Sequence, residues 1–492
     1  MRHRITLILL GILSFGLYIG LTGLAREFNW GEGYLNRPIP TYLALYFTLF
    51  ILYAGAATLV LKRLDDQASL WIILAFGLLF RAAIFPSQQI QEDDIYRYLW
   101  DGKVFAHGIN PYEYPPKLVS RYKSLQIRDP EEFQRLYDER NSRELELLYR
   151  LKWENPTALS FLERVNHPDI PTIYPPLAQY VFRIVHWLRP DSILAMRSMF
   201  LLFDLTALTF IILTLNALGK NRNLCIIYFW SPLLIKETFN STHLDILGVS
   251  FLCVSLYCYV RANLSAAILF LALSVLGKLY PIILLPLYLK RMTRNIHLLV
   301  LNLSLFTAII GIFYLPFLNI GMKAFAGLGA YASRWENNDS LFAILLYLFS
   351  SIPGLQSASF LSGNIAAFLC KATVALILLT VLLYLLARER EEGSLNDMND
   401  IFIMLGLVFL LSPVQNPWYL VWIVPFLCFF PGKSWILLTC LAGLYYLGFY
   451  FDYQEIKQYK PWIPWFEYPL FYYFLAAETG LIKRLKDRLI QA

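Results

Sequence analysis

Four carboxyl groups mark the segment of this chain most suited to chemistry. Glu92, Asp93 and Asp94 are consecutive and directly follow an apolar run that ends at Phe85, and Asp101 follows further along. Adjacent acids raise one another's pKa, which brings a carboxylate toward duty as a base near neutral pH. A solvated helix start accounts for the three consecutive acids equally well. Both interpretations stay open at this point.

Further polar residues lie inside apolar runs or at their ends, where ionisable groups are costly and are functional candidates by default. Lys278 lies between two half-length apolar segments, and a buried lysine requires an anionic partner such as a carboxylate or a phosphate. His243 and Asp245 begin another apolar run, where capping of that helix is the alternative to a site. The remaining candidates are Tyr96, Arg97 and Arg334, together with Trp418 and Tyr419, which fit an aromatic belt as well as sugar stacking.

No cofactor is predicted from these residues. His243 and Asp245 have no further metal-type partner at helical spacing, so a preformed metal site is not indicated. A divalent metal is compatible with the acidic cluster, but no pattern in the sequence calls for one.

The elements that position these residues are membrane helices. The chain has 492 residues, of which 58% are hydrophobic and 16% charged, whereas a soluble protein carries about 25% charged residues. Its net charge of +7 is distributed in short clusters between apolar runs, which follows the positive-inside rule and does not indicate a nucleic-acid partner. We therefore predict an all-α polytopic membrane protein in which residues 1–492 form a single domain.

Charge asymmetry also predicts which side of the membrane each loop faces. Apolar runs at 5–24, 40–61 and 69–86, with the basic residues of the N-terminus and of 62–63 inside, place the long segment 87–175 on the extracytoplasmic side. Further apolar runs include a span at about 195–217 and short spans at 224–238 and 244–261. Basic clusters, including one at 483–488, continue this parity to about fourteen crossings, with both termini cytoplasmic and 388–400 as a cytoplasmic loop.

Two turn signals predict structure inside the segment 87–175. Asp129 and Asn155 are each followed by proline, an arrangement typical of a capped helix start. We expect two or three short amphipathic helices on the membrane surface. In the second half of the chain, the segments 263–277 and 280–289 read as two half-helices broken at Lys278, which is tolerated where the freed backbone faces a polar cavity.

Several of these motifs together resemble a known family. They are DIYRY at 94–98, GINPY at 108–112, YPP at 174–176, HLD at 243–245, Lys278 with Pro281 and Pro286, and PWY at 417–419 with Trp422. Their order and predicted side of the membrane resemble the GT-C glycosyltransferases, in particular the bacterial polyprenyl-phosphate-mannose-dependent mannosyltransferases. The fold that this resemblance implies is a GT-C-like bundle whose large first outer loop carries the acidic motif.

The resemblance implies transfer of a hexose, with mannose favoured, from a polyprenyl-phosphate donor to a lipid or glycan acceptor. The reaction would take place on the extracytoplasmic face of a bacterial cytoplasmic membrane, in a single displacement that inverts the anomeric centre. Asp94 matches the family's catalytic base, and Asp93 is its nearest competitor. The substrate-binding candidates are Glu92, Tyr96, Arg97, Asp101, His243, Asp245, Lys278, Arg334, Trp418 and Tyr419.

Two other functions remain open from the sequence. A transporter or flippase of a lipid-linked or amphiphilic solute would also use broken helices and an intramembrane lysine. A polymerase or ligase of lipid-linked glycans would have the same outer site but take a pyrophosphate-linked donor. The insertion 117–167, longer than the resemblance leads us to expect, overhangs the predicted site and leaves the acceptor undetermined.

Overall fold

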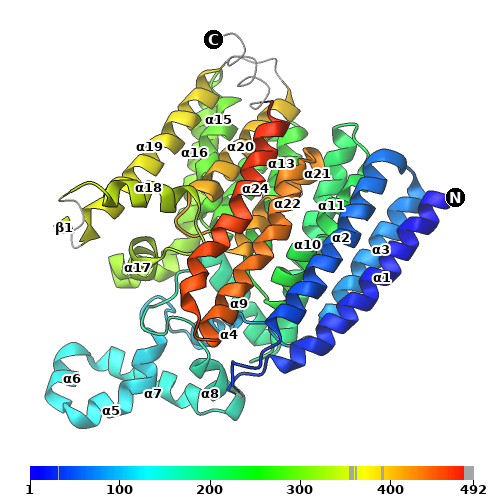
Figure 1. Cartoon of the computed structure of the whole chain (residues 1–492). Helices are drawn as coiled ribbons and strands as arrows, with labels where there is room; N and C mark the ends of the chain where they lie inside the picture. The colour runs from blue at the N-terminus through cyan, green and yellow to red at the C-terminus, as the bar shows by residue number, and fades with distance from the viewer. Residues whose placement is uncertain (32, 354–358, 361–362, 389–392, 481–492) are drawn as a thin grey trace.

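The chain folds into helices almost throughout (Figure 1). The computed structural model describes residues 1–31, 33–353, 359–360, 363–388 and 393–480. Within these residues the strands are two short antiparallel partners, β1 (Ser359–Phe360) and β2 (Gly363–Asn364). The prediction of an all-α protein is confirmed, with that small exception.

The first three helices pack side by side as long apolar rods (Figure 1). They are α1 (Arg2–Leu24), α2 (Ile39–Arg63) and α3 (Gln67–Ile84), close to the predicted spans. Asp66 begins α3 by accepting a hydrogen bond from the backbone N–H of Ser69 at 3.0 Å. Its other neighbour is Arg4, at 2.9 Å, so the N-terminus lies beside the α2–α3 turn.

The long polar segment contains five helices. These are α4 (Asp94–Ala106), α5 (Pro116–Arg128), α6 (Pro130–Leu136), α7 (Glu139–Lys152) and α8 (Pro156–Glu163). Both predicted helix starts are confirmed, because the Asp129 carboxylate accepts from the Glu132 N–H at 2.9 Å and the Asn155 side chain accepts from the Ala158 N–H at 2.8 Å. The expectation of two or three short helices was too low.

The middle of the chain holds the helices that flank the polar segment. They are α9 (Pro176–Leu188), α10 (Ile193–Ala217), α11 (Ile226–Phe229), α12 (Pro232–Ile235), the π-helix η3 (Lys236–Asn240) and α13 (Asp245–Val260). A continuous span at 224–238 was the wrong prediction. The helix stops at Trp230, and Ser231 caps a new short helix that begins with Pro232, because proline cannot donate to a continuing ladder.

The predicted break at Lys278 is confirmed. Helix α14 (Leu264–Gly277) ends where Lys278 takes an extended backbone conformation, and the chain continues in η4 (Tyr280–Leu284) and α15 (Leu285–Lys290). Helices α13 and α14 approach closely at two glycines. A Cβ on Gly277 would lie 3.0 Å from the Cα of Gly248, so only glycine permits this crossing.

The remaining helices complete the bundle. They are α16 (Ile296–Tyr314), η5 (Leu315–Phe325), α17 (Ala326–Arg334), α18 (Leu341–Ser350), α19 (Ile365–Ala387), α20 (Ser394–Leu411), η6 (Pro417–Trp422), α21 (Val424–Phe429), α22 (Lys433–Leu441), η7 (Ala442–Tyr446), α23 (Leu447–Tyr453), η8 (Lys457–Trp462) and α24 (Ile463–Glu478).

Eight helices in the described part of the chain are long and apolar enough to cross a membrane. Four shorter apolar helices of 10–17 residues add to them. The prediction of about fourteen crossings therefore stays a prediction. Residues 389–392 of the predicted loop 388–400, and the basic cluster 483–488, lie outside the described residues.

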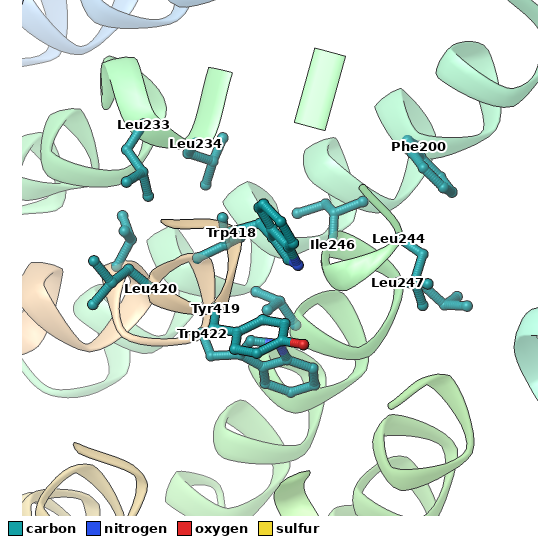
Figure 2. Close-up of a cluster of buried hydrophobic side chains, with 14 of the residues drawn as sticks. Phe200, Leu233, Leu234, Leu244, Ile246, Leu247, Trp418, Tyr419, Leu420 and Trp422 are labelled. Atoms are coloured by element: carbon teal, nitrogen blue, oxygen red, sulfur yellow. The ribbon is translucent and has the colours of Figure 1, made fainter. Parts of the chain in front are cut away.

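The interior is mainly apolar, but it also contains buried ion pairs. Trp418, Leu420 and Trp422 of η6 belong to one cluster of buried apolar residues with Leu244 and Leu247 near the start of α13 (Figure 2). Elsewhere, Arg81 of α3 and Asp204 of α10 form an ion pair at 2.6 Å, and both side chains are almost fully buried. This pair and the Figure 2 cluster connect helices that are distant in the sequence.

Candidate active site

A large cavity lies among the segments that carry the predicted site residues. Helices α4, α9 and α17 lie at the end of the bundle away from the N-terminus (Figure 1). The cavity measures about 380 Å³ and is partly open to solvent. Its polar lining residues are Gln91, Glu92, Asp94, Arg97, Tyr98, Asn166, His167, Tyr174, Asp245, Lys278, Tyr280, Tyr331, Asn337, Asn416, Tyr419 and Tyr445.

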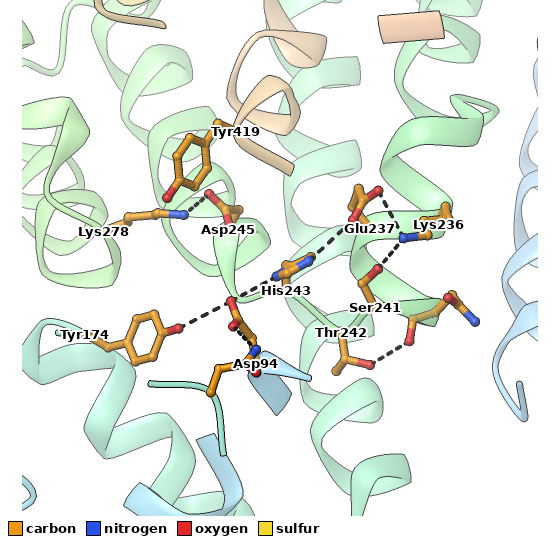
Figure 3. A network of polar contacts seen from close by, with 12 residues as sticks. Asp94, Tyr174, Lys236, Glu237, Ser241, Thr242, His243, Asp245, Lys278 and Tyr419 are labelled. Carbon is orange, nitrogen blue, oxygen red and sulfur yellow. Dashed lines mark hydrogen bonds and ion pairs between the residues drawn. The ribbon is translucent and has the colours of Figure 1, made fainter. Parts of the chain in front are cut away.

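Asp94 presents its carboxylate to this cavity from the first turn of α4. One oxygen, Oδ1, accepts a hydrogen bond from the Asn166 amide at 3.2 Å. The other, Oδ2, lies 3.4 Å from the Tyr174 hydroxyl and 3.4 Å from Nδ1 of His243 (Figure 3). The side chain stays 23% exposed. A group that enters the cavity can therefore reach a carboxylate whose orientation is already fixed.

The three consecutive acids differ in their electrostatic surroundings. Burial raises the pKa of Glu92 well above its usual value, and burial also raises the pKa of Asp93 despite the nearby Arg164. Burial opposes ionisation of Asp94 too, but interactions with His243 and Asn166 and the charge of Lys278 outweigh it and lower the pKa of Asp94. Mutual repulsion among the acids therefore does not make Asp94 a weak acid. Asp94 is the one member of the three whose surroundings lower its pKa.

Turns with unusual backbone geometry deliver the groups around Asp94. Gln91, His167 and Thr242 all have positive φ angles, of 71°, 50° and 61°. Such conformations are rare outside glycine and are costly for a β-branched residue. Arg197 stabilises the turn at Thr242, because its guanidinium donates to the Thr242 hydroxyl at 3.0 Å and to the carbonyl of Asn240 at 2.8 Å. That turn directs His243 toward Asp94.

Arg97 lines the cavity, but its guanidinium is committed to the backbone. It donates to the carbonyls of Asn166, His167 and Ile170 at 3.0, 2.8 and 3.2 Å. These bonds fix the loop that carries the Asn166 amide. Arg97 was predicted to bind substrate. Its N–H groups already donate to backbone carbonyls, and these carbonyls would compete with a substrate anion.

Lys278 has the anionic partner that the sequence required. Its ammonium group lies 2.5 Å from Oδ1 of Asp245, which also accepts a hydrogen bond from the indole N–H of Trp422 at 2.7 Å (Figure 3). The Lys278 ammonium also lies 4.1 Å from the centre of the Tyr419 ring, a cation–π contact. Asp245 thus pairs with Lys278 and does not orient His243.

Two aromatic residues of η6 also border the cavity. The ring of Trp418 stacks on His243 with 3.9 Å between centroids and 16° between planes. The hydroxyl of Tyr419 lies 2.8 Å from that of Tyr331 on α17. Both rings line the cavity, so the structure places them at the site, although sugar stacking itself stays a prediction.

Three other predicted site residues are not part of the cavity lining. Asp93 pairs with Arg164 at 2.5 Å, and the hydroxyl of Tyr96 donates to Gln89 at 3.1 Å. Asp101 is buried against Gln179, whose amide lies 3.4 Å from its carboxylate. The predicted residue Arg334 ends α17, and its side chain lies outside the described part of the structure.

Replacing Asp101 with Asn will stabilise the protein at alkaline pH. Burial raises the pKa of Asp101 to about 6, so the folded state resists its ionisation. Above pH 6 the folded protein carries this cost, whereas below pH 4 the carboxyl is protonated in both the folded and unfolded states. The gain is about 3 kcal/mol at pH 8 and disappears as the pH falls from 6 to 4. Thermal unfolding in detergent at pH 8 and pH 4 measures it, and an equal gain at both would contradict it.

Sequence reasoning missed several groups that the structure brings to the site. Asn166 contacts Asp94, Tyr331 contacts Tyr419, and Glu237 lies behind His243. The only sequence signal was the position of Glu237 in a polar stretch between two apolar runs. The site has no clear metal ligands, since the described residues contain no group of three or more His, Cys, Asp or Glu side chains able to hold a metal ion.

Comparison with protein families gives one match. Residues 354–473 match the family model described as MptB C-terminal domain. The match supports a membrane mannosyltransferase. It includes Trp418, Tyr419 and Trp422, but Asp94 and Lys278 lie outside it. Searches of curated proteins and of solved structures found no match.

Proposed function

We propose that this chain is a membrane glycosyltransferase that transfers mannose from a polyprenyl-phosphate donor to the hydroxyl of a lipid or glycan acceptor. One observation carries the proposal. A single cavity brings together an ionised carboxylate, Asp94, and a cation, Lys278, on different elements. Displacement of a phosphate by a hydroxyl requires these two groups, one for the incoming proton and one for the leaving anion.

A small apolar slot beside the main cavity marks the side toward which the lipid chain of such a donor would extend. Tyr280 and Tyr419 line both spaces, and the slot, at about 20 Å³, would have to widen to admit the chain. The remaining lining residues are Leu405, Val408, Phe409, Ser412, Val414, Trp422 and Ile423. Lys278 contacts both shared tyrosine rings. The donor phosphate would therefore lie near Lys278, with the prenyl chain toward the slot and the sugar toward Asp94.

The mechanism follows from this placement. Asp94 accepts the proton of the acceptor hydroxyl while that oxygen bonds to the anomeric carbon, and the bond from this carbon to the phosphate oxygen breaks. Lys278 stabilises the charge on the departing polyprenyl phosphate. Attack from the side opposite the phosphate inverts the anomeric centre. Trp418 and Tyr419 provide ring faces for the sugar.

We place the site on the extracytoplasmic face. The basic residues at the N-terminus and at the end of α2 lie together, as the contact between Arg4 and Asp66 indicates. Cation-rich ends face the cytoplasm, and the helices α4 and α17, which contribute residues to the cavity lining, lie at the other end of the bundle (Figure 1). In a bacterial cytoplasmic membrane this orientation allows use of a donor on the outer leaflet.

The test is transfer of radiolabel by the purified protein in proteoliposomes. We expect incorporation from polyprenyl-phosphate mannose into a lipid or glycan acceptor, and none from the pyrophosphate-linked sugar. Failure with every monophosphate donor, together with flux of lipid-linked solute across the vesicle membrane, would instead support the transporter. Transfer from the pyrophosphate donor alone would support a glycan polymerase or ligase.

A further inference from the structure

A row of polar groups leads from Asp94 away from the cavity into the protein. Oδ2 of Asp94 lies 3.4 Å from Nδ1 of His243, and Nε2 of the same ring lies 3.5 Å from Oε2 of Glu237 (Figure 3). The other oxygen of Glu237 lies 3.4 Å from the ammonium of Lys236. The imidazole ring therefore lies between two carboxylates, only one of which borders the cavity.

These inner groups are isolated from water. The side chains of His243, Glu237 and Lys236 are each about 1% exposed. Neither ring nitrogen of His243 has a hydrogen-bond partner with regular geometry, and neither does Oε2 of Glu237. Buried polar atoms almost always have partners. The two carboxylates are the groups toward which the ring nitrogens of His243 point.

The protein fixes the ring and supplies a countercharge. Trp418 stacks on His243 at 3.9 Å, which restricts rotation of the imidazole. Glu237 belongs to the π-helix η3, an element frequent at functional sites. Its Oε1 accepts from the Tyr446 hydroxyl at 2.9 Å and faces Lys236. Oε2 is left to face His243.

We propose that His243 receives the proton that Asp94 takes from the acceptor, and that Glu237 is a positioning residue for this transfer. The inference rests on the proposed glycosyltransferase function. Once Asp94 holds the acceptor's proton, a neutral ring that directs its Nε2–H toward Glu237 presents the lone pair of Nδ1 to the Asp94 O–H. The buried ring can then accept a proton without displacing a hydrogen bond.

The protons balance over one turnover. The hydroxyl proton moves to Asp94 as the new bond to the anomeric carbon forms and polyprenyl phosphate leaves. It then passes from Oδ2 of Asp94 to Nδ1 of His243, which restores the carboxylate and gives an imidazolium between two negative charges. After the product dissociates, the proton returns through Asp94 to water in the open cavity. No other reactant is required.

Physical chemistry gives a reason for the second step. General-base catalysis improves as the final proton acceptor becomes more basic, and an ordinary imidazole is about 2.6 pK units more basic than an aspartate. The surroundings lower the pKa of Asp94 further. A carboxylate that passes its proton to the ring combines a fixed orientation toward the substrate with a better final acceptor.

Other ionisable groups face this row and bear on its pH dependence. On the side of the cavity they are Asp94 and Glu92, and on the side of the core they are Lys236, Tyr42 and Tyr446. Lys236 offsets the charge of Glu237.

The test compares pH–rate profiles of wild type and Glu237→Gln in the transfer assay. We expect kcat to fall by about tenfold or more with little change in the donor KM. The acidic limb of the pH–rate profile, where the rate falls as the pH decreases, should move to lower pH by about one unit. The reason is that the imidazolium loses a stabilising carboxylate. Glu237→Asp, which keeps the charge, should recover part of the rate and return the limb toward its wild-type position.

Ser241→Ala is the matched control, since Ser241 accepts a hydrogen bond from Lys236 at 2.8 Å on the same turn but does not contact His243. Its acidic limb should stay at the wild-type pH. A Glu237→Gln protein that unfolds at the wild-type temperature yet keeps the wild-type limb would overturn the relay. If wild type transfers no sugar, or Asp94→Asn transfers normally, the proposed function fails first.

Discussion

Asp94→Asn will lower sugar transfer by about 10²- to 10⁴-fold, the contribution typical of a positioned general base. The amide is nearly the same size as the carboxylate and can still accept from Asn166, so the fold should persist. It cannot accept the proton of the acceptor hydroxyl. Single-turnover transfer of labelled mannose measures the chemical step directly. Donor affinity should change little, because the phosphate end of the donor lies near Lys278.

Asp93→Asn is the matched control for this change. The two acids are adjacent, but Asp93 pairs with Arg164 at 2.5 Å and does not line the cavity. We expect Asp93→Asn to lose much less activity than Asp94→Asn. Any activity that Asp93→Asn does lose should be explained by a loss of stability. Equal losses in the two variants, or normal transfer by Asp94→Asn, would show that Asp94 is not the base.

Lys278→Met will have the second largest effect, a fall in transfer of about 10²- to 10³-fold, similar to removal of one donor to a developing anion. Lys278 is a cation that reaches the cavity without a backbone commitment like that of Arg97. Its loss should also raise the KM for the anionic donor. Rates at saturating and subsaturating donor separate the two effects.

The change also leaves Asp245 buried without its cation, and that could lower activity by itself. The double variant Lys278→Met/Asp245→Asn separates the two causes, because it removes both charges. If Lys278 binds the phosphate, the double variant stays inactive although its thermal stability recovers. Wild-type transfer by the double variant would mean that the stranded carboxylate alone caused the loss.

Most long helices of this fold could be predicted because their signals are local. Apolar runs of sufficient length gave α1, α2, α3 and α10, and the Asx-Pro pairs gave the starts of α6 and α8. The span expected at 224–238 failed because Ser231-Pro232 and a π-helix interrupt it. The hydrophobicity of a segment therefore does not distinguish one continuous helix from several short helices.

The candidate site was only partly accessible from sequence. The carboxylate partner of Lys278 followed from the cost of a buried charge, but its identity as Asp245 depends on how α13 and α14 cross. The partners of Arg97, in contrast, could not be predicted. They are backbone carbonyls, and residue types do not reveal where those carbonyls lie. The lowered pKa of Asp94 likewise arises from His243, a neighbour contributed by a distant segment.

The glycine crossing of α13 and α14 fixes where Lys278 leaves the main chain. Gly277 directly precedes Lys278, and Gly248 lies one turn beyond Asp245, so the near contact of their backbones holds the main chain of Lys278 beside the helix that carries Asp245. Side-chain repacking cannot lengthen a distance that main-chain atoms determine. A larger residue at position 277 would therefore move Lys278 away from Asp245 even though neither charged group had been changed.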